Sequence, residues 1–188
     1  MRKVICSILC ITMLSGCVAT AMVAGASSIA GSVVYDKRSI SKIRQDAIIE
    51  REFYNIIDQQ DEFENASISI KSINNNALLV GYVENEHQKD LALNVLKTIK
   101  NVKKSYNQIR VGKPESALDE ANDIWLSGRV KAALLQKKGL HYSQISAMVR
   151  GGNVYLMGIV PNEKQAIATD IARSITGVKK VITLFENP

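Results

Sequence analysis

The chain has 188 residues and a formal net charge of +6, which is enough sequence for one ordinary domain or two small ones. Residues 36–113 carry 13 basic and 11 acidic side chains, and residues 114–188 carry 9 and 7, so each part has a net charge of only +2. The sequence contains no basic stripe with interleaved aromatic residues, which argues against nucleic acid as a partner.

The start of the chain has the layout of a secretory signal. Arg2 and Lys3 precede an uncharged apolar run of about eleven residues, which is too short to span a bilayer. The run ends in Leu14-Ser15-Gly16-Cys17, which fits the lipobox of bacterial lipoproteins. This resemblance implies that residues 1–16 are a lipoprotein signal peptide and that Cys17 is acylated. The alternatives are an ordinary cleaved signal with a chance cysteine, or an uncleaved anchor that continues to Tyr35.

Removal of residues 1–16 would leave a mature chain of residues 17–188 and would take Cys6 and Cys10 away. A mature protein whose one cysteine is acylated can form no internal disulfide, so its domains must be held by ordinary cores. Residues 17–45 are expected to be a lipidated N-terminus and a spacer. Ala, Gly, Ser and Thr dominate residues 18–34, a composition typical of a flexible linker, and about 25 such residues reach roughly 25–30 Å.

An internal repeat organises the rest of the chain. The sequence aligns with itself when its second half is laid over its first, with one extra residue in the first copy. The matching pairs include Asp46 with Asp123, "LLVGYV" (78–83) with "YLMGIV" (155–160), Ala92 with Ala168, and "VKK" (102–104) with "VKK" (178–180). The chain therefore holds two copies of one unit.

The second copy predicts the order of elements. Leu126, Val130 and Leu134 recur at four-residue spacing and predict one apolar helix face. The elements expected after this helix are a strand at 142–149, a tight turn at "GGN" (151–153), a strand at 154–160, a helix from Asn162 that ends at Gly177, and a strand at 178–185.

The expected fold class is α+β, with two tandem α-β-β-α-β domains. In each domain two helices would cover one face of a small mixed sheet, because a strand reached through a crossover helix can lie parallel to its partner. Gly81 and Gly158 occupy equivalent strand positions, and we expect them to allow a bulge or a close helix crossing rather than to approach a ligand.

These features resemble the BON domain family (bacterial OsmY and nodulation). The resemblance lies in an aspartate that opens the first helix, the pattern V-x-L-x-G-x-V on the second strand, alanines in the second helix and "GVKKV" (177–181). It places BON domain 1 at residues 46–113 and BON domain 2 at residues 114–188. The first copy departs from the pattern at Asn101, which replaces a glycine, and at its turn of Asn74, Asn75 and Asn76.

A chain with two such domains behind a lipobox resembles outer-membrane lipoproteins that face the periplasm. Val18, in the position where an aspartate would favour inner-membrane retention, agrees with that location. The resemblance implies binding of an anionic phospholipid of the phosphatidylglycerol type, with Asp123 and Trp125 in the matching motif. It further implies roles in envelope integrity, an association with the division site, and the outer-membrane protein assembly machinery as a partner.

Trp125 is the only tryptophan, and its expected helix direction lies roughly 100–140° from the core stripe of Leu126 and Val130. We therefore expect it to be at least partly exposed, on the same side as Gly128, Arg129 and Ala132. An indole beside a cation suits the headgroup level of an anionic membrane. The alternative is that Trp125 packs against the first domain or against the linker around Pro114.

Catalytic and metal-binding patterns are absent from the sequence. His87 and His141 are isolated in polar contexts without further metal ligands, so we expect no metal, no cofactor and no enzyme activity. The carboxylates of Asp58, Asp61, Glu62 and Glu64 are expected only to solvate a loop. The rival to phospholipid binding is a protein-interaction adaptor that docks on an envelope assembly machine through the face of Trp125.

Overall fold

The structure, a computed structural model, describes residues 40–140 and 144–188, and these described residues form one compact unit. The expected signal peptide, Cys17, residues 17–39 of the expected spacer and His141 lie outside the described residues. Residues 40–45, expected to be part of the spacer, belong instead to the first described helix, which begins at Ile40. Within the described ranges, every helix is too short or too polar to cross a bilayer.

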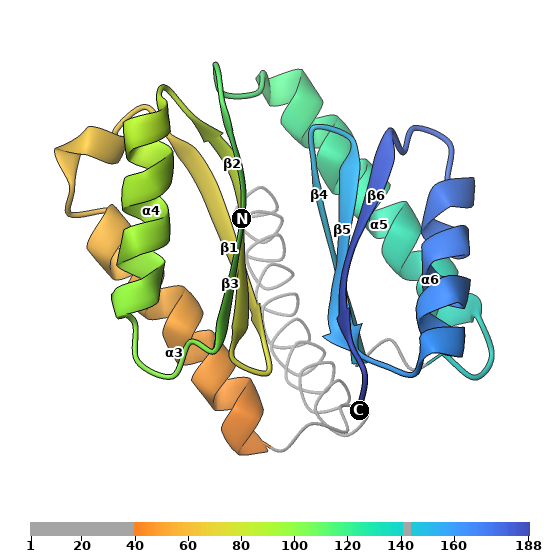
Figure 1. Cartoon of the computed structure of the whole chain (residues 1–188). Helices are drawn as coiled ribbons and strands as arrows, with labels where there is room; N and C mark the ends of the chain where they lie inside the picture. Colours follow the sequence, from red (N-terminus) through yellow and green to blue (C-terminus); the bar gives the residue numbers. More distant parts are fainter. Residues whose placement is uncertain (1–39, 141–143) are drawn as a thin grey trace, which may run out of the picture. The chain divides into compact units, whose positions relative to one another are not determined.

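The first half of this unit has the expected order of a helix, two strands, a helix and a strand (Figure 1). A short 3-10 helix follows the first α-helix and was not expected. The elements are α3 (Ile40–Ile57), η1 (Asp61–Phe63), β1 (Ser67–Ile73), β2 (Asn76–Val83), α4 (Glu86–Thr98) and β3 (Lys104–Val111).

The second half repeats this order. Its elements are α5 (Ala117–Gln136), β4 (Ile145–Arg150), β5 (Asn153–Ile159), α6 (Asn162–Ser174) and β6 (Lys180–Glu186). The expected helix end at Gly177 is wrong, because α6 ends at Ser174 and Gly177 lies in the following turn with a φ of 98°. The last strand begins at Lys180, two residues later than expected, because this turn extends past Gly177.

Each half forms a three-stranded mixed sheet, as predicted. In the first sheet β1 pairs antiparallel with β2 and β2 pairs parallel with β3; in the second, β4, β5 and β6 repeat the pattern. The parallel pairs arise because α4 and α6 carry the chain back to the starting end of the sheet before the last strand. The expected α+β fold of two small mixed sheets is confirmed.

The turns between the antiparallel strands explain why the first copy can depart from the glycine pattern. Gly151 and Gly152 both have positive φ, of 63° and 73°, as a two-residue hairpin turn requires. At the equivalent positions Asn74 and Asn75 have φ of 55° and 68°. Asparagine tolerates the left-handed region better than other residues with a side chain, so both turns adopt the same backbone path.

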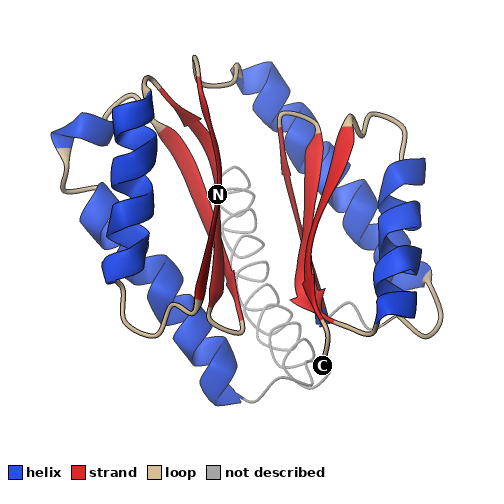
Figure 2. Ribbon diagram, viewed as in Figure 1, coloured by secondary structure: helices blue, strands red, loops and turns tan. Residues whose placement is uncertain are grey.

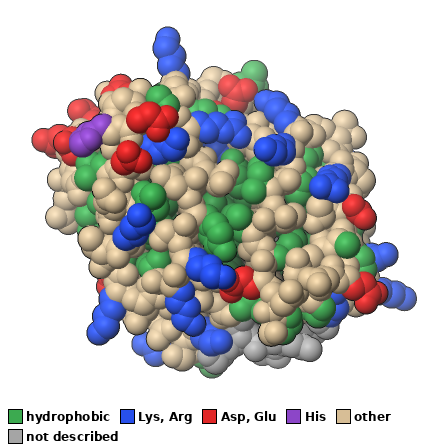
Figure 3. Space-filling model, in the orientation of Figure 1, with side chains coloured by type: hydrophobic (Ala, Val, Ile, Leu, Met, Phe, Trp, Pro, Cys, Tyr) green, Lys and Arg blue, Asp and Glu red, His purple; other side chains and the backbone are tan. Residues whose placement is uncertain are grey.

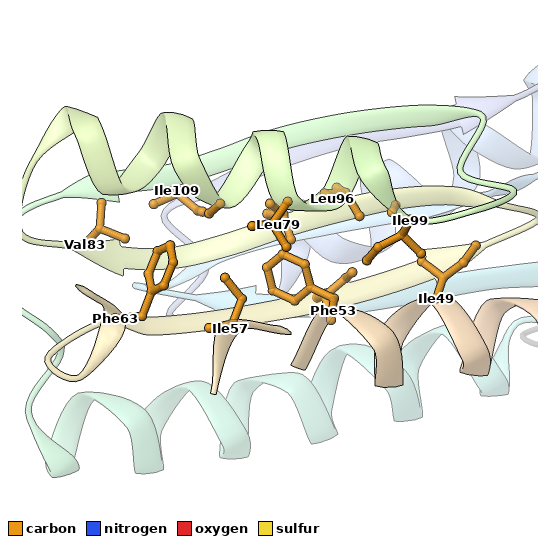
Figure 4. Packing of buried hydrophobic residues seen from close by; sticks show 13 residues of the cluster. Ile49, Phe53, Ile57, Phe63, Leu79, Val83, Leu96, Ile99 and Ile109 are labelled. Atoms are coloured by element: carbon orange, nitrogen blue, oxygen red, sulfur yellow. The ribbon is translucent and has the colours of Figure 1, made fainter. Parts of the chain in front are cut away.

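The helices of each half pack on one face of its sheet (Figure 2). Figure 4 shows the core of the first half, where Phe53 and Ile57 of α3 meet Leu79 of β2 and Leu96 of α4. The core of the second half is built from the equivalent elements, with Val130 and Leu134 of α5 among its members.

A third apolar cluster involves the opposite sheet faces, where Leu78 and Val80 of β2 pack with Tyr155 and Met157 of β5. Both faces of β2 and β5 are therefore buried, which explains why these two strands are continuously apolar rather than alternating.

Gly81 and Gly158 have a structural role, but the close neighbour at each is the backbone beside the adjacent strand and not a crossing helix. A Cβ atom on Gly81 would lie 1.9 Å from the carbonyl oxygen of Ser67, and one on Gly158 would lie 2.1 Å from that of Gln144. Only glycine fits at these two positions, where neighbouring backbones approach closely.

Candidate functional site

The start of α5 is fixed by a capping box. The Ser116 hydroxyl oxygen accepts from the Asp119 backbone N–H at 3.2 Å, and the Ser116 N–H donates to the Asp119 carboxylate at 3.3 Å. Hydrogen bonds from the Ser116 hydroxyl and backbone N–H hold the pKa of Asp119 below its ordinary value. These contacts determine where α5 begins and hence which residues each of its faces presents.

Asp123 connects α5 to the turn between β4 and β5. Its two carboxylate oxygens accept from the backbone N–H groups of Gly151 at 2.6 Å and Gly152 at 2.9 Å, and the side chain is 5% exposed. The family resemblance grouped Asp123 with the phospholipid-binding residues, but its carboxylate lies on the buried side and is used within the fold. We therefore assign it the role of holding α5 against the sheet.

The inward face of α5 consists of Leu126, Val130 and Leu134, all fully buried, as the apolar spacing predicted. Trp125 lies outside this stripe and is 54% exposed, which confirms the expected exposure. The Arg129 guanidinium carbon lies 4.9 Å from the centroid of the Trp125 ring, within the range of a cation–π contact. Trp125 and Arg129 thus form one surface feature.

The outward side of α5 is apolar along the whole helix. Gly128 and Ala132 are exposed or partly exposed beside Trp125, and three further large side chains are more exposed than Trp125: Leu118 at 80%, Ile124 at 75% and Leu135 at 62%. We define the α5 apolar face as Leu118, Ala121, Ile124, Trp125, Gly128, Ala132 and Leu135, none of which is buried.

Leu118, Ala121, Ile124 and Leu135 were not predicted as members of the site. The signal for them was present, because apolar residues recur at three- and four-residue intervals along a second side of the helix. Periodicity alone does not separate this side from the core stripe, because both sides repeat at the same interval. A surface helix usually has one apolar side, so the second, exposed apolar side makes α5 the candidate interaction surface.

Helix α3 of the first half provides an internal comparison. In the alignment of the two copies Ile48 corresponds to Trp125, but the residues equivalent to the rest of the face are mostly polar. Arg51, Glu52, Asn55 and Asp58 stand where α5 has Gly128, Arg129, Ala132 and Leu135. The apolar outward face is therefore a property of the second copy and not of the repeat.

Acidic and basic side chains lie at opposite ends of α5. Asp119 and Glu120 lie in its first turn, whereas Arg129, Lys131, Lys137 and Lys138 lie in its second half or directly after it, and all of them are exposed. The second half of the apolar face is thus bordered by cations. On the face drawn in Figure 3, Lys and Arg are scattered and form no continuous stripe.

Within the described ranges, no group of three or more His, Cys, Asp or Glu side chains could hold a metal ion. His87 lies in the first turn of α4 and is exposed.

Comparison with known proteins agrees with this geometry. A family model described as "BON domain" matches residues 45–113 and 122–186. "Outer membrane lipoprotein DolP" of Haemophilus influenzae is 30% identical over 174 residues, covering 92% of this chain and 89% of the relative. "21 kDa hemolysin" of Actinobacillus pleuropneumoniae is 26% identical over 151 residues, covering 80% and 78%, and "Osmotically-inducible protein Y" of Escherichia coli is 28% identical over 124 residues, covering 64% and 62%.

Two repeated α-β-β-α-β units with an apolar helix face on the second define a tandem two-domain protein of α+β class. The chain belongs to the BON domain family. It is an outer-membrane lipoprotein and is similar to DolP over nearly its whole length, as the lipobox and the two repeats indicated.

Proposed function

We propose that the protein is a non-enzymatic lipoprotein whose second BON domain binds anionic phospholipid, of the phosphatidylglycerol type, through the α5 apolar face. The observation that carries this proposal is the exposure of Leu118, Ile124, Trp125 and Leu135 along one side of α5. Full burial of one such side chain contributes about 1.5–3 kcal/mol, so partial insertion of four can supply several kcal/mol.

The charges beside the face support an anionic partner. Each Lys or Arg near an anionic membrane surface contributes about 1 kcal/mol, and Arg129, Lys131, Lys137 and Lys138 lie in or just after the second half of α5. Arg129 also contacts the Trp125 ring, so the cation and the indole would reach the headgroup level together. Trp125, Gly128, Arg129 and Ala132 form the proposed contact, with Asp123 holding the helix from its buried side.

The membrane anchor of this proposal is Cys17, acylated after removal of residues 1–16, with the domains on the periplasmic side. Three acyl chains exceed what stable anchoring requires. Mass spectrometry of the mature protein tests this part, because an unmodified Cys17 would contradict it. On the basis of the resemblance, we propose that the protein supports envelope integrity. We further propose that it associates with the division site and with outer-membrane protein assembly.

The test of phospholipid binding is Trp125→Glu in a chain that begins at residue 18, sedimented with phosphatidylcholine vesicles that contain or lack phosphatidylglycerol. We expect the variant to lose binding to the anionic vesicles, because a carboxylate replaces the indole at the interface. Its free energy of unfolding should change by no more than about 1 kcal/mol, since the ring is exposed and loses one cation–π contact. Binding by the parent chain should weaken as salt screens the cations.

The matched control is Ile48→Glu, the same substitution at the equivalent position of α3. This variant should bind anionic vesicles as the parent does. If Trp125→Glu also binds like the parent, the α5 apolar face is not the lipid contact, and docking on a protein takes its place.

A further inference from the structure

A groove of about 320 Å³ lies in the first BON domain, where α3, η1 and β1 meet. We call it the acidic groove. It is lined by Tyr54, Ile57, Asp58, Gln60, Phe63, Glu64, Ala66 and Ile68.

The floor of the acidic groove is apolar and firmly held. Ile57 and Phe63 are buried members of the domain core, and Figure 4 shows them next to each other. Tyr54 forms a wall, and its hydroxyl oxygen accepts from the backbone N–H of Ile70 at 3.3 Å, which fixes the ring. An apolar side chain of a partner could therefore bind without rearrangement of the groove.

The rim carries an uncompensated negative charge. Residues 52–70 hold five acidic side chains and no Lys or Arg, in a chain whose net charge is +6. Asp58 and Glu64 line the groove, and Asp61 and Glu62 belong to the adjoining η1. In the part of the chain that the structure describes, none of these four carboxylates forms a salt bridge. An occupant with positive charge would complement this rim.

The arrangement of the carboxylates distinguishes between kinds of occupant. They do not converge, and no metal-binding group of His, Cys, Asp or Glu exists among the described residues. An anionic membrane surface would be repelled by the same charges. A peptide with spaced cations and apolar side chains satisfies both the rim and the floor.

The edge of β1 adds hydrogen-bonding groups to the groove. Among the described residues this strand pairs with β2 alone. Its outward N–H groups at Ile70 and Ser72 donate to Tyr54 and, at 2.8 Å, to Glu50. The alternation of an antiparallel ladder places the N–H of Ile68 on the same outer edge. No side chain of the described residues accepts a hydrogen bond from the backbone N–H of Ile68. This N–H is therefore available to a partner where the edge of β1 enters the groove.

We propose that the acidic groove is a docking site for an extended segment of a partner protein that alternates basic and apolar residues. The segment would add to the edge of β1 at Ile68, place an apolar side chain over Phe63, and bring its cations to Asp58 and Glu64. This mode combines main-chain hydrogen bonds for affinity with side-chain pockets for specificity. The first domain would then bind protein, independently of any lipid binding by the second.

The test uses the full chain in a zwitterionic detergent and the peptide acetyl-Lys-Val-Lys-Val-Lys-Val-Lys-amide, with binding followed by calorimetry. We expect Asp58→Asn combined with Glu64→Gln to weaken binding roughly threefold to tenfold at low salt, since each exposed ion pair contributes modestly. The matched control is Asp90→Asn combined with Glu163→Gln, which removes the same charge from exposed sites outside the groove and should leave binding unchanged.

Three results would overturn the proposal. The first is equal weakening by both double variants, which indicates nonspecific attraction. The second is equal binding of a peptide with Ser in place of Val, which indicates that the apolar floor is unused. The third is loss of vesicle binding by the groove variant, which indicates a membrane surface. If the groove variant does not fold, the amide NMR shifts of Ala66 and Ile68 in the parent chain must move on peptide addition, and their failure to move contradicts the proposal.

Discussion

Asp46 and Asp123 are equivalent residues of the two repeats, and each holds a turn to the first helix of its own domain. Asp46 accepts from the Ser72 hydroxyl and the backbone N–H groups of Asn74 and Asn75, as Asp123 does from Gly151 and Gly152. Both carboxylates are buried, which a surface contact with lipid would not require. The aspartate of the BON pattern is therefore explained by folding.

Replacing Asp123 by Ala should lower the free energy of unfolding by about 2–4 kcal/mol. The substitution leaves two N–H groups without an acceptor, and each buried donor left unsatisfied costs about 1–3 kcal/mol, with neighbouring costs less than additive. Urea denaturation measures the change, with Asp170→Ala on the exposed surface of α6 as a control expected within about 0.5 kcal/mol. A loss below about 1 kcal/mol for Asp123→Ala would contradict the structural role.

At the scale of the element, α5 differs from α3 because it has two apolar sides. One side is buried in the domain core and the other is the exposed α5 apolar face. Gly128 lies on the exposed face, and a Cβ atom there would meet nothing within 4 Å. Gly158 on β5 is the opposite case, because its Cβ would overlap the carbonyl oxygen of Gln144.

These two glycines give opposite predictions for the same substitution. Gly128→Ala should raise the free energy of unfolding by about 0.5–1 kcal/mol, because Ala favours a helix interior over Gly by that amount. Gly158→Ala should lower it by more than about 2 kcal/mol, since its φ of 157° and the close carbonyl both exclude a side chain. Thermal melts of the two variants side by side measure this, and a shift of the melting temperature in the same direction would refute it.

At the scale of the whole unit, polar contacts accompany the third apolar cluster. The Arg150 guanidinium of β4 donates to the Ser69 hydroxyl of β1 at 2.7 Å and lies 3.3 Å from Glu115. The Glu186 carboxylate of β6 accepts from Lys104 of β3 and, at 2.8 Å, from the amide of Asn76. The hydrogen bond from Lys104 holds the pKa of Glu186 below its ordinary value of 4.5.

Because the pKa of Glu186 is lowered, the contact between Glu186 and Lys104 should contribute to the stability of the fold in a pH-dependent way. A carboxyl whose pKa is lower in the folded chain stabilises the fold above its unfolded pKa, and this contribution is lost as the pH falls through the folded pKa. Lys104→Met should therefore lower the melting temperature at about pH 6, and its difference from the parent should shrink below about pH 4.5.

Lys97→Met, on the exposed side of α4, is the control and should show no such convergence with the parent. Melting curves between about pH 3 and pH 7 provide the measurement. If the melting temperatures of Lys104→Met and the parent differ by the same amount over this whole range, the contact between Lys104 and Glu186 does not depend on pH and the prediction is wrong.

Much of the fold could be predicted from the sequence, because it depends on short-range patterns. The internal repeat, the spacing of Leu126, Val130 and Leu134, and the "GGN" turn each specify local geometry without knowledge of the rest of the chain. The direction of Trp125 followed from the same periodicity, since a helix fixes the angle between residues. The boundaries near Gly177 could not be fixed in this way, because fraying and turn formation compete over a few residues.

Features that depend on residues distant in sequence became visible only in the folded structure. Asp123 accepts hydrogen bonds from a turn inside the fold and is not a surface contact. This is because Gly151 and Gly152, which follow it by 28 and 29 residues in the chain, lie beside it in the folded structure. The acidic loop of residues 58–64 borders a groove because β1 folds back against the end of α3. Periodicity determines which side of a helix is apolar, whereas burial depends on which surfaces the rest of the chain covers, and only folding brings those surfaces together.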